Sequence, residues 1–421
     1  MSEVESPGHV VAIIGAAVSG SVAARYLAER GCEVVVFEQN DRPYGKIEDG
    51  LPRWHTKLRQ QEYREIDQRL SHPRIHFVPR TRLGRDVDFE SLATTWGFSA
   101  VLLANGAWRD RPLEIPGVDA YVDRGLVYQN ALVHWFNHKN ERGYAGPRYE
   151  VPDGALCVGG GLASIDVIKI VQLEIYERAL GKSGIETNML ELEHEGIPKL
   201  CQKKGVDPKS LGVTDGLLVY RRRVEDMPLA EAPTDATPDQ LRKVELTRRK
   251  LLEVAQRKFL FRFQERRVPK SVLVEGDRLA GLTVLETRVE GRKVEPVPGS
   301  EHELRAPLVV SSIGSVPARI PGVAMRGETY AFKSWETGEY EGLPNVFGIG
   351  NVVTGKGNIR ESFEHGESIA RHVMEGPLAR APLAAEQVRA LLERVRERQR
   401  AVGYEQDYAA WMASHTPADL A

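Results

Sequence analysis

Two glycine-rich loops each follow a short apolar segment and precede an expected helix. The first is GAAVSG at residues 15–20, and the second is GGGLAS at residues 159–164. A dinucleotide-binding loop has glycine first for a tight turn, a small third residue beside the pyrophosphate, and a small sixth residue where helix packs on strand. The second loop has this pattern, and the first carries Ala17 at the third position. Both loops therefore predict a dinucleotide at a helix N-terminus.

An acidic residue accompanies the first loop. Glu38 ends the apolar segment at residues 34–37 and lies 18 positions after Gly20. A carboxylate at this place hydrogen-bonds ribose hydroxyls, which favours an unphosphorylated ribose such as that of FAD or NAD. The alternative is an ordinary strand–turn–helix. The strand, the loop, the helix and the acidic residue all occur at the positions expected of a dinucleotide-binding unit, so we favour nucleotide binding.

Three arginines take the place of the acid after the second loop. Arg221, Arg222 and Arg223 follow the apolar segment at residues 217–220. Guanidinium groups match phosphate oxygens bidentately, so this position predicts the 2′-phosphate of NADP. A solvated basic turn is the alternative, and a long insertion separates loop and arginines. Two nucleotide folds with different ribose chemistry predict one bound prosthetic group and one exchanging nucleotide, most economically FAD with NADPH.

A third glycine-rich segment lies near the end of the folded core. It has the sequence FGIGNVVTGKGNIRESF at residues 347–363, with a strand ending at Gly350 and a helix beginning near Asn358. A helix N-terminus carries partial positive charge, and directed at the flavin it would stabilise the reduced, anionic form. An ordinary β–loop–α turn explains the pattern equally well.

The elements that must position these loops alternate between strand and helix. Strands are expected at residues 10–14, 34–37, 100–104, 155–158, 217–220, 308–313 and 346–349, with several short ones between 260 and 310. Helices are expected at residues 19–30, 163–179, 239–259, from 358, and at 384–402 as a surface element. Residues 181–216 form a polar, helix-rich insertion. Repeated strand–helix–strand units predict an α/β fold with parallel sheets.

Composition excludes several classes of protein. The 421 residues carry 57 Lys and Arg against 59 Asp and Glu, so no basic excess indicates nucleic acid or an anionic membrane. Three cysteines without a CxxC pair exclude a disulfide framework and an internal iron–sulfur cluster. The acidic start is no signal peptide, and no apolar run is long enough to span a membrane. We expect no bound metal and a cytoplasmic location.

Taken together, these passages resemble a known family. The segments VVAIIGAAVSGSVAARYLAERGCEVVVFEQNDRPYGKIEDGLPRWHTKL, FSAVLLANGAWRDRPLEIPGVD, ALCVGGGLASIDVIKI, VYRRRVEDMP and FGIGNVVTGKGNIRES occur in the order found in adrenodoxin reductase-like ferredoxin–NADP reductases, within the glutamate synthase small-subunit-like FAD/NAD(P)-binding flavoproteins. The resemblance covers residues 9–375. It implies two Rossmann-like domains, with the NADP domain inserted into the FAD domain. We therefore expect FAD-binding residues 8–125 and 315–380, NADP-binding residues 126–314, and a C-terminal helical tail at 381–421.

The resemblance also implies roles for individual residues. The candidate FAD-binding residues are Gly15, Ala17, Val18, Ser19, Gly20, Glu38, Gln39, Gly45, Lys46, Leu51, Ala104, Asn105, Gly106, Gly350, Asn351, Gly357, Asn358 and Ile359. The candidate NADP-binding residues are Gly159, Gly160, Gly161, Leu162, Ala163, Arg221 and Arg222. His55 matches a histidine near the flavin that would tune its potential or relay a proton, and an ordinary loop histidine is the equal alternative. Gly350-Asn351 stands where relatives have Gly-Trp or Gly-Asp.

The expected activity is electron transfer from NADPH through FAD to a separate carrier protein such as a ferredoxin. Alternatives are a reductase subunit of a larger iron–sulfur complex, direct reduction of a small organic substrate, and a flavin-bound assembly module without turnover. Seven basic residues crowd the helix at 239–258 and would suit an acidic ferredoxin. A solvated helix face is the more favoured interpretation of that charge.

Overall fold

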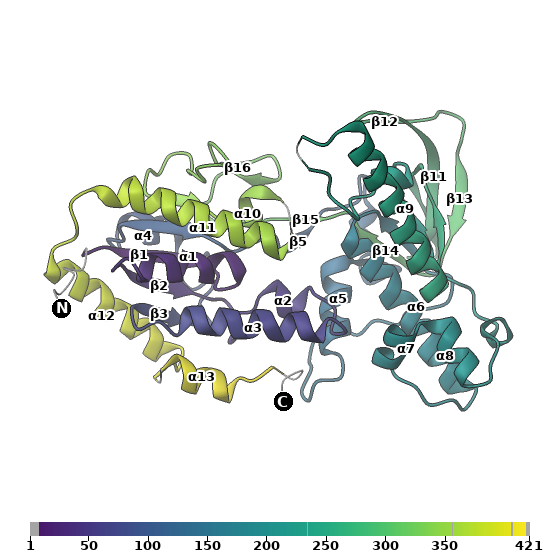
Figure 1. Cartoon of the computed structure of the whole chain (residues 1–421), viewed down its shortest axis with the longest axis horizontal. Coiled ribbons are helices and arrows are strands. Elements are labelled where there is room, and N and C mark those ends of the chain that lie inside the picture. Colours follow the sequence, from purple (N-terminus) through teal and green to yellow (C-terminus); the bar gives the residue numbers. More distant parts are fainter. Residues whose placement is uncertain (1–7, 234, 356, 406, 418–421) are drawn as a thin grey trace. The chain divides into compact units, whose positions relative to one another are not determined.

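The chain forms two compact units, one inserted into the other. The computed structural model describes residues 8–233, 235–355, 357–405 and 407–417. The first unit contains the chain up to Arg109 and from Ser315 onward, and the second unit is Asp110–Gly314 (Figure 1). The boundary expected after residue 125 therefore lies inside the second unit. The reason is that Leu113, Ile115 and Val118 belong to the apolar core of that unit.

The first unit is built on a five-stranded parallel sheet. Its strand order is β18 (Val346–Gly348), β4 (Ala100–Leu103), β1 (Val10–Ile14), β2 (Glu33–Phe37) and β3 (Ile75–Val78). All five residues of β1 are buried, as expected for a strand covered on both faces. Parallel strands bring their carboxyl ends to one edge of the sheet, where ligands of open α/β sheets bind.

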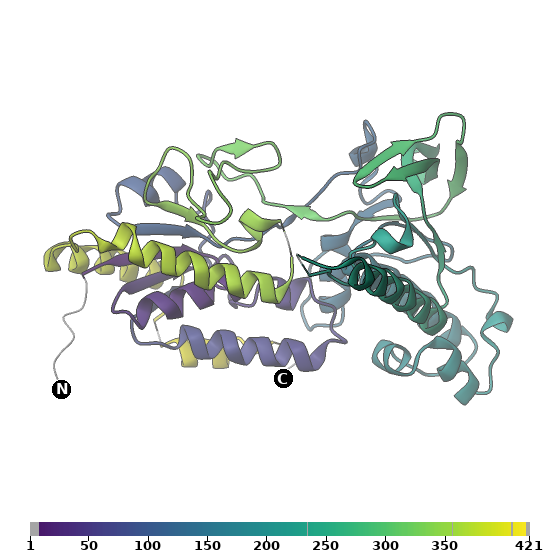
Figure 2. The same ribbon diagram turned by 45° about the horizontal axis from the view of Figure 1, so that its top comes forward.

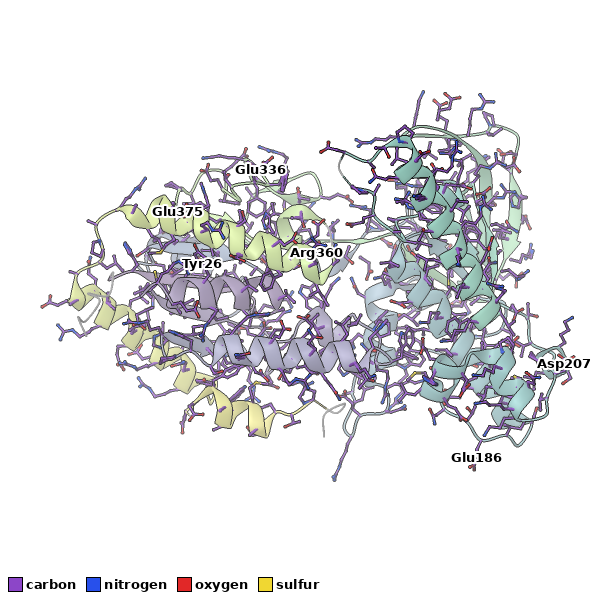
Figure 3. All side chains as sticks on the ribbon, viewed as in Figure 1. Tyr26, Glu186, Asp207, Glu336, Arg360 and Glu375 are labelled. Carbon is purple, nitrogen blue, oxygen red and sulfur yellow. The ribbon has the colours of Figure 1, made fainter. Side chains whose placement is uncertain are left out.

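Helices cover both faces of this sheet. The core on one face contains residues of α1 (Val18–Ala28), α3 (Thr56–Leu70) and α11 (Ile359–Glu375). The core on the other face contains residues of α4 (Phe89–Thr94) and α12 (Ala385–Ala401). In Figure 2, α11 lies alongside α1. Figure 3 labels Tyr26 on α1 and, next to it, Arg360 and Glu375 on α11. This pairing brings the third glycine-rich segment beside the first.

The C-terminal helices, expected as a tail at 381–421 with a surface helix at 384–402, pack on the first unit. Leu391 and Val395, four residues apart on α12, are buried in its core. In α13 (Tyr408–Ser414), the Trp411 indole N–H donates to the carbonyl of Asp41 at 2.8 Å. Most residues of α12 are charged or polar, so its two buried apolar residues form too narrow a stripe to be recognised from the sequence.

The second unit has its own five-stranded parallel sheet. The strand order is β6 (Leu126–Tyr128), β14 (Val309–Ser312), β7 (Leu156–Gly159), β8 (Leu217–Val219) and β9 (Arg262–Gln264). Its long helices are α5 (Gln129–His138), α6 (Leu162–Lys182) and α9 (Pro238–Phe259). The two parallel sheets with their helices confirm the predicted α/β, Rossmann-like fold class.

Two additions decorate the second unit. The insertion expected at 181–216 contains α7 (Met189–Glu195), α8 (Ile197–Lys203) and a 3-10 turn at Pro208–Leu211, and Figure 3 labels Glu186 and Asp207 there. The β segments expected between 260 and 310 form an antiparallel sheet of β10 (Arg267–Glu275), β11 (Arg278–Glu290), β12 (Lys293–Pro296) and β13 (His302–Arg305). At 13 residues, β11 is longer than the predicted short segments.

The remaining elements are short. They are α2 (Lys46–Asp49), β5 (Arg109–Asp110), β15 (Ser315–Val316), β16 (Met325–Arg326), β17 (Thr329–Tyr330), α10 (Asn351–Thr354), and 3-10 turns at Val118–Tyr121, Val224–Asp226 and Pro377–Ala379. All three cysteines are buried and unpaired. Within the described residues, no helix combines the length and apolar character needed to cross a membrane.

Candidate dinucleotide sites

The first glycine loop is shaped by two close approaches of the backbone. Gly15 has a φ of 101°, and a Cβ there would lie 2.7 Å from the carbonyl oxygen of Ala104. A Cβ on Gly20 would lie 1.9 Å from the carbonyl oxygen of Gly15. Only glycine fits at either position. Ala17 caps α1 without a side-chain hydrogen bond, so the helix N-terminus keeps the polarity that suits a phosphate. Val18 and Ser19 begin this helix and are buried.

Glu38 lies at the carboxyl end of β2, where the sequence predicts it. Its side chain is 4% exposed, and its two oxygens accept hydrogen bonds from the N–H groups of Ala16 and Asn40, each at 3.0 Å. Burial raises the pKa of Glu38 to about 7, and these two hydrogen bonds oppose the shift. The carboxylate thus braces the glycine loop and keeps further lone pairs for a ribose hydroxyl. Gln39, which follows it, is partly exposed.

The segment from Gly45 to His55 approaches the first loop at Gly45. Gly45 has a φ of 49°, and a Cβ there would meet the Cβ of Ala17 at 3.0 Å. Lys46 begins α2, with its ammonium 3.3 Å from the Ser315 hydroxyl. The Leu51 carbonyl accepts a hydrogen bond from Arg59 at 2.8 Å. His55 is the N-cap residue of α3 and is partly buried, and its role near a flavin stays a prediction.

Two asparagines add polar groups at this sheet edge. Asn105 follows β4 between Ala104 and Gly106, and its amide nitrogen donates to the Tyr330 hydroxyl at 2.9 Å. Asn351 follows Gly350 at the start of α10. The Oδ1 atoms of both asparagines are buried and have no hydrogen-bond partner among the described residues. Buried acceptors without partners are costly, so a bound group that donates to them would relieve that cost.

The third glycine-rich segment meets the first loop at Ser19. A Cβ on Gly350 would lie 2.5 Å from the Ser19 hydroxyl oxygen, and one on Gly366 would lie 2.8 Å from the Ser19 carbonyl oxygen. Asn358 caps α11 by accepting the Glu361 N–H at 2.7 Å, so the predicted helix start is correct. Gly357 precedes it in an exposed position, and Ile359 is the first residue of α11.

Sequence reasoning missed His365 in this region. It lies inside α11 and is 8% exposed. Its Nδ1 accepts the Gly350 N–H at 2.8 Å, and its Nε2 donates to the Trp335 carbonyl at 2.7 Å. The available signal was its spacing, because His365, Ile369 and Val373 recur every four residues along one helical face. A histidine on an otherwise apolar stripe indicates a buried polar contact.

These residues of the first unit fit a dinucleotide such as FAD. The loop admits close approach of a pyrophosphate, a carboxylate lies where the ribose is expected, and two buried acceptors without partners lie on neighbouring loops. This set of features is what a ligand with phosphate, hydroxyl and ring N–H groups requires.

The second glycine loop is equally crowded. A Cβ on Gly160 would lie 2.2 Å from the ring of Tyr220, and one on Gly159 would lie 2.2 Å from the Ser312 carbonyl oxygen. Gly161 caps α6, and the first two residues of that helix, Leu162 and Ala163, are exposed. The helix N-terminus is therefore open to a ligand, as a phosphate-binding loop requires.

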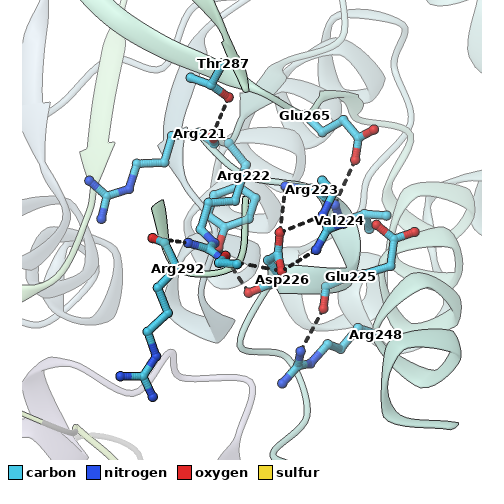
Figure 4. A network of polar contacts seen from close by, with 12 residues as sticks. Arg221, Arg222, Arg223, Val224, Glu225, Asp226, Arg248, Glu265, Thr287 and Arg292 are labelled. Carbon is cyan, nitrogen blue, oxygen red and sulfur yellow. Dashed lines mark hydrogen bonds and ion pairs between the residues drawn. The ribbon is translucent and has the colours of Figure 1, made fainter. Parts of the chain in front are cut away.

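The arginine cluster after β8 divides into engaged and exposed members (Figure 4). Arg222 donates to the carbonyls of Arg292 and Gly291 at 3.0 and 2.7 Å, and it forms an ion pair with Asp226 at 3.4 Å. Arg223 also binds Asp226, at 3.0 Å. Arg221 is exposed, and its guanidinium makes no hydrogen bond or ion pair with the described part of the chain. Arg221 and Arg222 are the two residues predicted to bind the 2′-phosphate. Arg222 is engaged in contacts within the protein, whereas the exposed Arg221 guanidinium is available to a phosphate.

Similarity to known proteins agrees with this geometry. The family model of the NAD(P)-binding Rossmann-like domain matches residues 13–52, which hold the first loop and Glu38. The chain is 25% identical to NADPH:adrenodoxin oxidoreductase of Arabidopsis thaliana, over 73% of this chain and 68% of that one. It is 24% identical to a putative glutamate synthase [NADPH] small chain of Cereibacter sphaeroides, over 89% and 79%. The predicted resemblance to both groups is confirmed.

One further relative and one solved structure are also similar to this chain. The chain is 26% identical to NADPH-Fe(3+) oxidoreductase subunit beta of Geobacter sulfurreducens, and spans only 37% of its length. Among solved structures, it resembles Mycobacterium tuberculosis FprA in complex with NADPH, with a TM-score of 0.70 at 19% identity over 93% of this chain and 90% of that one. At this identity the structural likeness shows the shared two-domain fold alone.

Proposed function

We propose that this chain is an FAD-dependent oxidoreductase that takes electrons from NADPH and delivers them to a separate electron-carrier protein. The predicted class, a flavin-dependent NAD(P)H oxidoreductase, agrees with relatives that are named as NADPH oxidoreductases. The observation that carries the proposal is the presence of two Rossmann-like units in one chain with opposite charge at their ribose positions, Glu38 in one and Arg221 in the other.

The first unit supplies a binding site rather than reacting groups. FAD, when bound, supplies the hydride acceptor and can pass electrons on singly. Glu38 would hold the adenosine ribose, and the N-terminus of α1 would face the pyrophosphate. Asn105 and Asn351 offer buried acceptors to donor groups of the ligand. The chain thus orients the cofactor and excludes water from these contacts.

The second unit would bind NADPH as the exchanging nucleotide. The open N-terminus of α6 receives its pyrophosphate, and Arg221 receives its 2′-phosphate. Arg222 supports this arrangement through its hydrogen bonds to Gly291 and Arg292, which hold the β11–β12 turn near the end of β8.

The partner we propose is a ferredoxin-like protein or an iron–sulfur subunit. The described chain holds three buried cysteines, so clusters ligated by thiolates would come from the partner. We also propose that it works in a reducing cytoplasm, where unpaired cysteines are the norm.

A second candidate is a reductase subunit within a larger iron–sulfur flavoprotein. The similarity to a putative glutamate synthase small chain over 89% of this chain favours it. Affinity purification of the chain from its native cells tests this candidate. Stoichiometric recovery of one iron-containing subunit would support it, and recovery of the chain alone would contradict it.

Turnover with a one-electron protein acceptor tests the main proposal. Purified holoprotein is mixed with NADPH, a plant-type [2Fe–2S] ferredoxin and cytochrome c, and cytochrome c reduction is followed with and without ferredoxin. We expect reduction that depends on both NADPH and ferredoxin. Flavin-loaded protein that passes no electrons to ferredoxin or ferricyanide would contradict the proposal and favour an assembly module without turnover.

A further inference from the structure

His365 makes two hydrogen bonds that together fix its protonation state. A backbone N–H can only donate, so the Nδ1 that accepts from Gly350 carries no hydrogen. A carbonyl can only accept, so the Nε2 facing the Trp335 oxygen carries the hydrogen. Both contacts exist together only in the neutral imidazole protonated at Nε2. A doubly protonated ring would lose the Gly350 contact.

The group that His365 holds is the turn at the start of α10. Gly350 has a φ of 70° and lies against the Ser19 side chain of α1. Its carbonyl accepts hydrogen bonds from Val353 and Thr354 at 3.0 and 3.1 Å, while its N–H donates to His365. Both backbone groups of Gly350 are therefore committed. The next residue is Asn351, whose Oδ1 is buried and has no hydrogen-bond partner among the described residues.

His365 also links three segments that are distant in the sequence. Its own helix α11 packs on α1, Gly350 follows β18, and Trp335 belongs to the loop between β17 and β18. The Trp335 side chain is 62% exposed, so this residue contacts His365 through its backbone carbonyl.

We propose that neutral His365 is a positioning residue that sets the Gly350–Asn351 turn for the bound flavin nucleotide, and that its protonation releases the turn and weakens flavin retention. The inference rests on the proposed function for the identity of the ligand. The imidazole of His365 contacts the backbone of the Gly350–Asn351 turn and takes no part in the reaction itself.

Burial favours the neutral form. It lowers the pKa of His365 below its usual value, while the hydrogen bond to the Trp335 carbonyl and the Glu361 carboxylate, one turn earlier on α11, oppose this effect. Other titratable groups on the packed segments are Lys333, Glu336 and Glu339 beside Trp335, and His372 further along α11. Because the native state disfavours the proton, the contribution of His365 is present above pH 6.5, the ordinary histidine value. It is lost as the pH falls through the lowered native pKa.

The test compares flavin release in three variants of the holoprotein. His365→Gln places an amide where one acceptor and one donor are needed, and it does not titrate. His365→Ala removes both contacts. His372→Gln, on the same helix, is the control, because the His372 side chain is 38% exposed and lies 3.9 Å from the Glu339 carboxylate and edge-on to the Phe347 ring, away from Gly350 and Trp335. Dissociation of FAD is followed by the rise of its fluorescence between pH 5 and 8, with circular dichroism to verify folding.

We expect the wild type and His372→Gln to release flavin about tenfold faster at pH 5 than at pH 8, as expected for loss of one buried hydrogen bond. We expect His365→Gln to retain flavin at pH 8 and to show a smaller acceleration at pH 5 than the wild type, with the remaining pH dependence coming from Glu38, whose pKa is raised to about 7. We expect His365→Ala to release flavin rapidly at every pH. Equal pH profiles for wild type and His365→Gln would overturn the proposal. A protein that binds no FAD would contradict the proposed function as well, whereas normal flavin binding that ignores His365 would contradict this inference alone.

Discussion

The two glycine loops of this chain meet opposite charges at the same topological position. After β2, Glu38 is buried and bound to the N–H groups of its own loop and of the following turn. After β8, Arg221 is exposed, while Arg222 and Arg223 are engaged by the β11–β12 turn and Asp226. A buried, braced carboxylate suits a ligand that stays bound. An exposed guanidinium beside a helix N-terminus suits one that arrives, binds through its phosphate and leaves.

The largest expected effect comes from filling either loop. Gly20→Ala places a methyl group 1.9 Å from the Gly15 oxygen and Gly160→Ala places one 2.2 Å from the Tyr220 ring, and neither can be accommodated without moving the loop. Gly20→Ala should yield protein without flavin, seen as loss of visible absorbance. Gly160→Ala should stay yellow but lose reduction by NADPH.

Gly181→Ala is the matched control for these variants, because a Cβ there meets nothing within 4 Å inside α6. It should behave as wild type. Loss of flavin in Gly160→Ala, or retention of flavin in Gly20→Ala, would break the assignment of one nucleotide to each loop.

The next effect separates the two arginines. Arg221→Ala should raise the KM for NADPH by about 10- to 100-fold, the worth of a charge-assisted hydrogen bond to phosphate, and leave the KM for NADH unchanged. Arg222→Ala should instead loosen the β11–β12 turn, detected as faster proteolysis near Gly291, with a smaller change in KM. Steady-state kinetics and limited proteolysis check both. Equal loss of NADPH and NADH activity in Arg221→Ala would refute its role at the 2′-phosphate.

A moderate effect is expected at the acid. Glu38→Gln keeps one acceptor toward Ala16 or Asn40 and replaces the other oxygen by a donor. FAD affinity should fall by about tenfold, or ~1.4 kcal/mol, without any change in preference between NADPH and NADH. Fluorescence titration of apoprotein with FAD measures the first, and the KM ratio measures the second. A changed preference between NADPH and NADH would show that Glu38 acts in the nicotinamide nucleotide site, which would contradict its assignment to FAD.

The smallest effect concerns the basic helix α9. Arg242, Lys243, Lys250 and Arg257 are exposed on it, whereas Arg249 pairs with Glu225. Replacing Arg242 and Lys250 by Gln should raise the KM for an acidic ferredoxin about two- to fivefold at low salt and leave ferricyanide reduction unchanged. Lys270→Gln in β10, where Lys270 pairs with Glu301, is the control. An unchanged KM would show that α9 is an ordinary solvated face.

Local patterns predicted much of this molecule. The β1–α1–β2 unit, Glu38 at its strand end and the Asn358 start of α11 all depend on short stretches whose spacing has one favourable geometry. What the sequence could not predict depends on contacts between distant segments. The segment at 110–125 joins the second unit through its apolar residues, and α12, a charged surface helix as expected, packs on the first unit through Leu391 and Val395. His365 was missed because its partners, Gly350 and Trp335, are 15 and 30 residues away.

We expect that a tightly bound flavin in this protein accepts electrons from NADPH in preference to NADH. An anaerobic visible spectrum of the purified protein, titrated with NADPH and in a second sample with NADH, tests it most directly. We predict a flavin spectrum that bleaches near one equivalent of NADPH, with NADH far less effective. A yellow protein that neither nucleotide bleaches would contradict the assigned NADPH site, and a colourless protein that does not take up FAD would contradict the flavin site.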